Sequence, residues 1–219
     1  MANPLSDMYD FVMPYCPGAT SSFVDSQIRR VMRQFLRRST ILRELLPLTL
    51  TPNVNSLVLT PTTAGLEVAG VLWLRVNTGF DTGAVQFNPI HQLQEESGYR
   101  SDNNAVTGAP RGYNYFTPSA VIVSPPPDKA YPVQVEVYET TPLDGSVTTY
   151  PPACSPYLDV IGRGVVAELM GMPAKPFSDP QHAMLYQKLF GERTLAIRDE
   201  LRQGGSRSVA TVRGPRFGA

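Results

Sequence analysis

The sequence predicts an α+β protein with a helical-bundle core, an inserted antiparallel β-sandwich or barrel-like domain, and an extended C-terminal arm. Apolar residues follow helical spacing near both ends of the chain, and short runs between them alternate with a period of two. The 219 residues include 21 prolines spread along the chain, about twice the usual ~5%, which favours many stiff turns. We therefore expect a helical core of residues 1–47 and 153–203, an inserted β domain of residues 48–152, and a flexible arm of residues 204–219.

Two helices are expected before the β domain. Residues 5–13 predict a short helix, which Pro14 and Pro17 end. Ser22 and Asp25 then match a capping box at the start of a longer helix, and Pro47 ends it. The apolar residues of this longer helix share one face: Ile28, Val31, Met32, Phe35, Leu36, Ile41, Leu42 and Leu45.

The longer helix is rich in arginine. Residues 29–43 hold six arginines and no acidic residue, although the whole chain has a formal net charge of zero. A basic helix can neutralise nucleic-acid phosphates, but arginine is also favoured at protein interfaces because its planar fork pairs with carboxylates. The zero net charge and the scarcity of lysine favour a subunit interface, with nucleic-acid binding as the alternative. The interface residues would be Arg29, Arg30, Arg33, Arg37 and Arg38.

The middle of the chain predicts short strands. The clearest is residues 133–138, where apolar and polar residues alternate, so that one face is buried and the other wet. Residues 77–112 are rich in glycine and asparagine and predict a long loop, which is usually functional or mobile at such a length. We expect a protruding hairpin or loop here, which orders against a neighbouring protein. The other strands are predicted at residues 48–50, 57–59, 68–76, 113–116 and 120–123.

A helical hairpin follows the β domain. Helical spacing returns after residue 155, Gly171 lies near the end of the first helix, and the prolines that follow forbid its continuation. Asp179 fits the N-cap of a second helix, and Pro180 fits its first position. We call the corner between the two helices the elbow; it consists of Met172, Pro173, Lys175, Pro176, Phe177, Asp179 and Pro180.

The last residues predict no helix. Gly204 and Gly205 form a flexible joint, and a basic peptide with alternating Val209 and Thr211 follows, which is suited to adding a strand to a partner. We expect its binding residues to be Arg207, Val209, Thr211, Val212, Arg213, Arg216 and Phe217.

A search for catalytic chemistry finds little. His91 and Glu95 have helical spacing that suits a metal, but a third ligand is missing. Cys154 and His182 could act as nucleophile and base, but the residues around Cys154 match no known protease motif. Cys16 and Cys154 are expected to be reduced thiols of a cytoplasmic product. No apolar run approaches the ~18 residues that span a bilayer. We expect no enzymatic activity, no cofactor and no membrane partner; a hydrolase using His91 and Glu95 is the weakest alternative.

Three segments resemble the head-to-tail adaptor proteins of tailed bacteriophages. Residues 12–19 and 28–39 are similar to the opening of those proteins, in which a proline- and glycine-containing turn precedes an arginine-rich helix. The elbow, within residues 169–180, is similar to their corner between two helices. The last helix is similar through Ala183, Tyr186, Phe190 and the run to Arg198. Residues 77–112 lie outside this resemblance.

The resemblance implies a structural virion protein of the neck, assembled in the host cytoplasm. Such adaptors form a ring, often of twelve subunits, beneath the portal protein. They extend the channel for genomic DNA, which passes without sequence specificity, and they offer a surface to tail or nozzle proteins. In several relatives a C-terminal arm reaches the portal, so residues 207–217 would be the portal-binding arm. A stopper or tail-tube terminator is the alternative, although stoppers are usually smaller and dominated by β structure.

Overall fold

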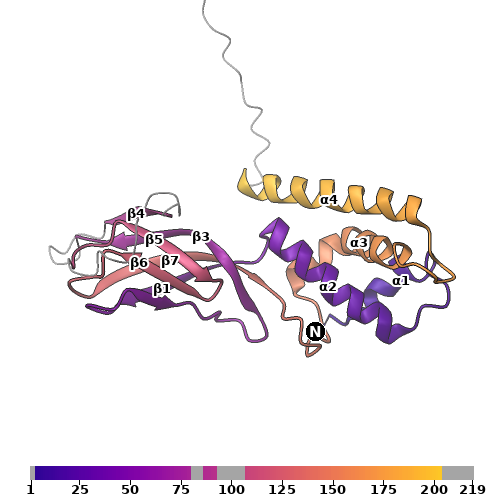
Figure 1. Cartoon of the computed structure of the whole chain (residues 1–219), viewed down its shortest axis with the longest axis horizontal. Coiled ribbons are helices and arrows are strands. Elements are labelled where there is room, and N and C mark those ends of the chain that lie inside the picture. Colours follow the sequence, from indigo (N-terminus) through magenta and orange to yellow (C-terminus); the bar gives the residue numbers. More distant parts are fainter. Residues whose placement is uncertain (1–2, 80–85, 93–106, 204–219) are drawn as a thin grey trace, which may run out of the picture.

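Helices and a sheet occupy the two ends of the molecule in the computed structural model, which describes residues 3–79, 86–92 and 107–203 (Figure 1). This confirms the α+β class with a barrel-like sheet. Helix α4 lies along one side of the other helices. In chain order the helical elements are η1 (Leu5–Met8), α1 (Tyr9–Val12), α2 (Ser21–Ser39), η5 (Pro152–Tyr157), α3 (Leu158–Met170) and α4 (Pro180–Arg202), of which η1 and η5 are 3-10 helices.

Seven strands form one mixed sheet that curls into a nearly closed barrel, in the order β1-β7-β3-β4-β5-β6-β2. All neighbouring strands are antiparallel except β4 and β5, where His91 pairs with Gly112 in parallel. The strands are β1 (Arg43–Leu50), β2 (Ser56–Val58), β3 (Glu67–Asn77), β4 (Phe87–Gln92), β5 (Gly112–Thr117), β6 (Ala120–Ser124) and β7 (Tyr131–Thr140).

The prediction of a purely antiparallel domain is wrong at β4. This strand lies within residues 77–112, where a protruding hairpin or loop was expected. Parallel neighbours need a long connection in the chain, and β4 ends at Gln92 whereas β5 begins only at Gly112. The remaining predicted strands are confirmed, and β7 has the expected alternation of inward and outward side chains.

The helix before the sheet ends earlier in the chain than predicted. Helix α2 ends at Ser39 because Thr40 adopts the left-handed conformation (φ 52°, ψ 36°) and its amide closes the last turn on the Leu36 carbonyl at 3.0 Å. Strand β1 then begins at Arg43, four residues before Pro47. Pro47 is tolerated because β1 is an edge strand with β7 as its one neighbour in the sheet order. Leu45, expected on the buried helix face, is therefore 50% exposed.

The predicted capping box at Ser22 is wrong as well. The N-cap of α2 is Thr20, whose side chain makes no capping hydrogen bond. Asp25 lies inside the helix and accepts a hydrogen bond from the Tyr9 hydroxyl at 2.8 Å. The carboxylate thus joins α2 to α1 rather than capping its own helix.

Two separate hydrophobic clusters support the two ends of the molecule. The first lies among the helices and includes Val12, Phe35, Ile161 and Phe190. The second lies inside the sheet. Residues 141–150 connect the two ends and are tied to the N-terminal segment, because the Tyr150 hydroxyl donates to Asp7 at 3.0 Å. None of the helices in the described ranges combines the length and the hydropathy needed to cross a membrane.

Candidate partner-binding groove

The elbow sets the direction of α4. Asp179 caps the helix as predicted: its Oδ1 accepts hydrogen bonds from the amides of Gln181 and His182, both at 3.1 Å. Hydrogen bonds from the amide and ring of His182 lower the pKa of the Asp179 carboxyl. Phe177 is buried in the helical cluster, which anchors the corner. Within the elbow, Met172 is half-buried, and Pro173, Lys175, Pro176 and Pro180 are exposed.

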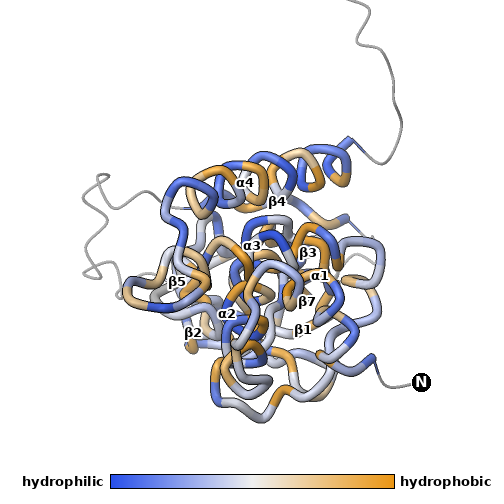
Figure 2. Tube along the Cα trace, turned by 90° about the vertical axis from the view of Figure 1, so that its right-hand side faces the viewer, coloured by the Kyte–Doolittle hydropathy of each residue, from blue (hydrophilic) through white to orange (hydrophobic). Residues whose placement is uncertain are grey.

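Helix α4 has two faces of different character, and Figure 2 shows hydrophobic and hydrophilic residues alternating along it. The packed face, formed by Ala183, Phe190, Thr194 and Ile197, is buried. The second face has successive steps of four and three residues, which place its members on one side of a helix. We call it the groove face; it consists of Met184, Lys188, Gly191, Leu195, Arg198 and Arg202.

The first half of the groove face lines a hollow of about 670 Å³ beside the elbow. We call it the elbow hollow. Its walls are mainly apolar, and its charged residues have partners: Arg30 lies 3.6 Å from Glu168, and Lys188 lies 3.8 Å from Glu192. The lining residues are Arg30, Ala167, Glu168, Gly171, Met172, Pro173, Ala183, Met184, Gln187 and Lys188.

The second half of the groove face lines a hollow of about 470 Å³, which we call the arginine hollow. Helix α2 contributes its last arginines, α4 contributes two more, and β3 and β7 complete the wall. Among the residues that the structure describes, no acidic one lines it. The lining residues are Arg37, Arg38, Thr40, Leu72, Tyr138, Gly191, Leu195, Arg198 and Arg202.

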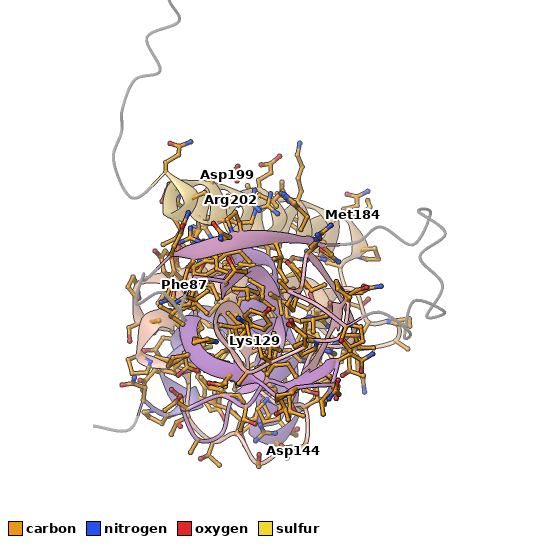
Figure 3. All side chains as sticks on the ribbon, turned by 90° about the vertical axis from the view of Figure 1, so that its left-hand side faces the viewer. Phe87, Lys129, Asp144, Met184, Asp199 and Arg202 are labelled. Carbon is orange, nitrogen blue, oxygen red and sulfur yellow. The ribbon has the colours of Figure 1, made fainter. Side chains whose placement is uncertain are left out.

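The two hollows follow one another along the same sides of α2 and α4. Arg30 in the first hollow and Arg37 in the second are seven residues apart, which places both on one side of α2. The same holds for the groove face of α4. Figure 3 shows Met184 and Arg202, from the two halves of that face, on the side of the molecule away from Asp144.

The arginines predicted to form one interface have separate roles. Arg29 donates to the Val147 carbonyl at 2.7 Å, and Arg33 donates to the Thr141 carbonyl at 3.1 Å. Arg33 also pairs with Glu67 at 3.1 Å. These two arginines hold the segment between the sheet and the helices. Arg30, Arg37 and Arg38 are exposed, and contact with a second subunit stays a prediction.

Sequence reasoning missed the residues that complete the arginine hollow. Leu72 and Tyr138 come from strands far from α2 in sequence, and Arg198 and Arg202 come from the other end of the chain. The regular steps of the groove face were a usable signal for α4, because arginine and leucine fall together on them. The predicted arm, residues 207–217, lies outside the described residues.

Both cysteines are buried in the structure. Burial raises the pKa of the Cys16 thiol to about 11 and that of Cys154 to about 12, so neither is a thiolate at neutral pH. His91 lies in β4, and Glu95, its predicted metal partner, is outside the described residues. Within the described ranges, no group of three or more His, Cys, Asp or Glu residues is placed to hold a metal.

Comparison with known proteins adds no relative: no family model matches the chain, and no curated protein matches it.

Proposed function

We propose that this chain is a structural head-to-tail adaptor of a tailed bacteriophage particle. Copies of it would form a ring beneath the portal, twelve by the resemblance, that extends the DNA channel and receives tail or nozzle proteins. In this proposal the helices form a bundle core around the channel, the barrel-like sheet faces the tail, and residues 204–219 are an arm that binds the portal. The protein would be a component of the virion neck.

One observation carries the proposal. The three segments that resemble the adaptor family lie apart in sequence but pack together as one unit. Val12 from the first segment, Phe35 from the arginine-rich helix, and Phe177 and Phe190 from the elbow and last helix all belong to one hydrophobic cluster. A resemblance by chance would not be expected to select residues that share a core, so this packing supports a common architecture.

The shape of the molecule is also suited to a connecting role. Its sheet and helices stand at opposite ends, each with its own cluster, so that each end is free to contact a different neighbour (Figure 1). The arginine hollow adds a concave surface, in which Arg37, Arg38 and Arg202 make no ion pair with any described residue. A ring repeats each such contact, and avidity strengthens the whole assembly.

The direct test is native mass spectrometry of the full chain, alone and mixed with the portal ring encoded by the same genome. We expect a large complex in the mixture, with several copies of this chain on each portal ring. Absence of any complex over a range of salt concentrations would contradict the adaptor function.

A truncation tests the arm separately. We expect a chain ending at Gln203 to fold, because every element of the described fold precedes that residue, and to lose portal binding. A matched variant of the full chain, with Arg207, Arg213 and Arg216 changed to glutamine, shows whether charge is what the arm contributes. If the truncated chain still decorates portal rings, the arm is not the portal contact, although the adaptor function would stand.

A further inference from the structure

We propose that the arginine hollow binds a short acidic segment of a protein partner, with carboxylates facing the guanidinium groups and an apolar side chain against Leu72 and Leu195. This inference concerns the recognition chemistry of the hollow and does not depend on the adaptor function.

The first argument is the uncompensated charge. Four arginines line a space of about 470 Å³ without an acidic neighbour in its wall. The side chains of Arg37, Arg38 and Arg202 make no ion pair or hydrogen bond with any residue that the structure describes. Arg198 has one ion pair, at 3.6 Å, with the adjacent Asp199. Guanidinium groups that line one hollow repel one another, and carboxylates bound there relieve that repulsion through paired, charge-assisted hydrogen bonds.

The second argument is the shape of the hollow. Its volume falls within the range of about 300–1,000 Å³ that is typical of binding pockets. Gly191 forms part of the wall, and a Cβ atom added there would meet no other atom within 4 Å. A side chain at this position would have free space around it, and glycine leaves that space open.

The third argument separates a protein partner from a nucleic acid. Leu195, one turn before Arg198 on α4, is 45% exposed, and Leu72 lies in the same wall. A phosphate backbone gives such apolar groups nothing to contact, whereas a peptide with alternating acidic and apolar residues satisfies both. Arginine rather than lysine supplies all the charge, as is common where planar carboxylates are recognised at protein interfaces.

The arm of this chain is not the occupant. Residues 204–219 contain Arg207, Arg213 and Arg216 and no acidic residue. They carry the same charge as the hollow and would be repelled from it. The acidic segment that we propose comes from a separate protein chain.

The test is fluorescence anisotropy with the full chain and a short labelled peptide of alternating glutamate and leucine. A peptide with glutamine in place of glutamate and a short labelled DNA duplex are the comparison probes. We expect the acidic peptide to bind at least about tenfold more tightly than either comparison probe at moderate salt, where nonspecific phosphate contacts weaken. Equal or tighter binding of the duplex would overturn the proposal in favour of a polyanion surface.

Two comparisons between variants locate the binding, and the first compares two double variants. Arg37→Gln with Arg202→Gln removes two charges from the hollow, and Arg163→Gln with Arg193→Gln removes two exposed charges that do not line it. We expect the double variant in the hollow to weaken peptide binding about tenfold or more, and the double variant outside it to change binding by less than about twofold. Equal effects of the two double variants would overturn the proposal.

The second comparison changes the free volume of the hollow without changing its charge. Gly191→Phe places a ring in the hollow, and Gly191→Ala adds one methyl group where there is free space. We expect peptide binding to be lost in the first variant and kept in the second, with circular dichroism showing that both are folded. Unchanged binding by Gly191→Phe would show that the peptide does not enter the hollow.

Discussion

The packed face and the groove face of α4 belong to the same helix but meet very different surroundings. Phe190, on the packed face, is 1% exposed and presses against Gly164 of α3, where an added Cβ would lie 2.9 Å from its ring. Gly191, the next residue, has free space beside it. The packed face holds α4 in the fold, whereas the groove face contributes little to it. The side chains on the groove face are therefore available for a partner.

The largest expected difference is in the free energy of unfolding after truncation of one side chain on each face. Phe190→Ala should cost about 3–5 kcal/mol, because it leaves a cavity in the helical cluster. Leu195→Ala, on the groove face, should change stability by no more than about 0.5 kcal/mol. Urea denaturation of both variants measures this. Similar costs would show that the groove face is packed after all.

A pH titration separates stability from binding. Burial, together with the neighbouring Glu44, raises the pKa of the Glu139 carboxyl from 4.5 to about 7, and the residue is 4% exposed. The folded state therefore holds this proton more tightly than the unfolded state. The stabilisation is complete below about pH 4.5 and is lost as the pH rises through 7, by about 3 kcal/mol.

Glu139→Gln removes this titration. We expect the wild-type chain to lose stability relative to the variant between about pH 5 and pH 8 in urea denaturation. The arginines of the hollow stay charged throughout, so peptide binding should be flat between about pH 6 and pH 8. Parallel stability curves for the two chains would contradict the assignment to Glu139.

Two alanine substitutions for glycine sharpen the comparison of the two faces. Gly164→Ala should destabilise the fold by about 1–3 kcal/mol, because the new methyl group would lie 2.6 Å from Val31 and too close to Phe190. Gly191→Ala should stabilise it by up to about 1 kcal/mol, since alanine is the better helix former and has room. Opposite signs in chemical denaturation are the expected result, and a loss of stability in both would contradict it.

The smallest expected effect concerns the elbow. Asp179→Ala removes the N-cap of α4 and should cost about 1 kcal/mol. Peptide binding should not change, because Asp179 does not line the arginine hollow. A loss of peptide binding without loss of stability would mean that the elbow also takes part in recognition.

The elbow and the ends of α4 could be predicted from the sequence because their signals are local. Asp179 and Pro180 act within one turn of the helix that they begin. The same holds for β7, whose alternation is read along one strand. At residues 41–45, two local signals conflict, because the leucines there fit a helix and a strand alike. The left-handed conformation of Thr40 ends the helix, so these residues are free to form a strand.

The rest depends on contacts between distant residues. The parallel pairing of His91 with Gly112 has no local pattern, and β4 is short and contains a proline, Pro89. The arginine hollow joins the end of α2, the end of α4 and two strands. The sequence showed both groups of arginines, but only the packing of α4 against α2 and α3 brings Arg37 and Arg202 to one hollow.

If this chain connects the portal to the tail, a density map of the intact particle at the portal–tail junction should show a ring of it in contact with the portal. Each arginine hollow should then hold an acidic segment of a neighbouring protein. A ring of this chain placed further along the tail, without portal contact, would rule out the connecting role, as would a particle that lacks the chain.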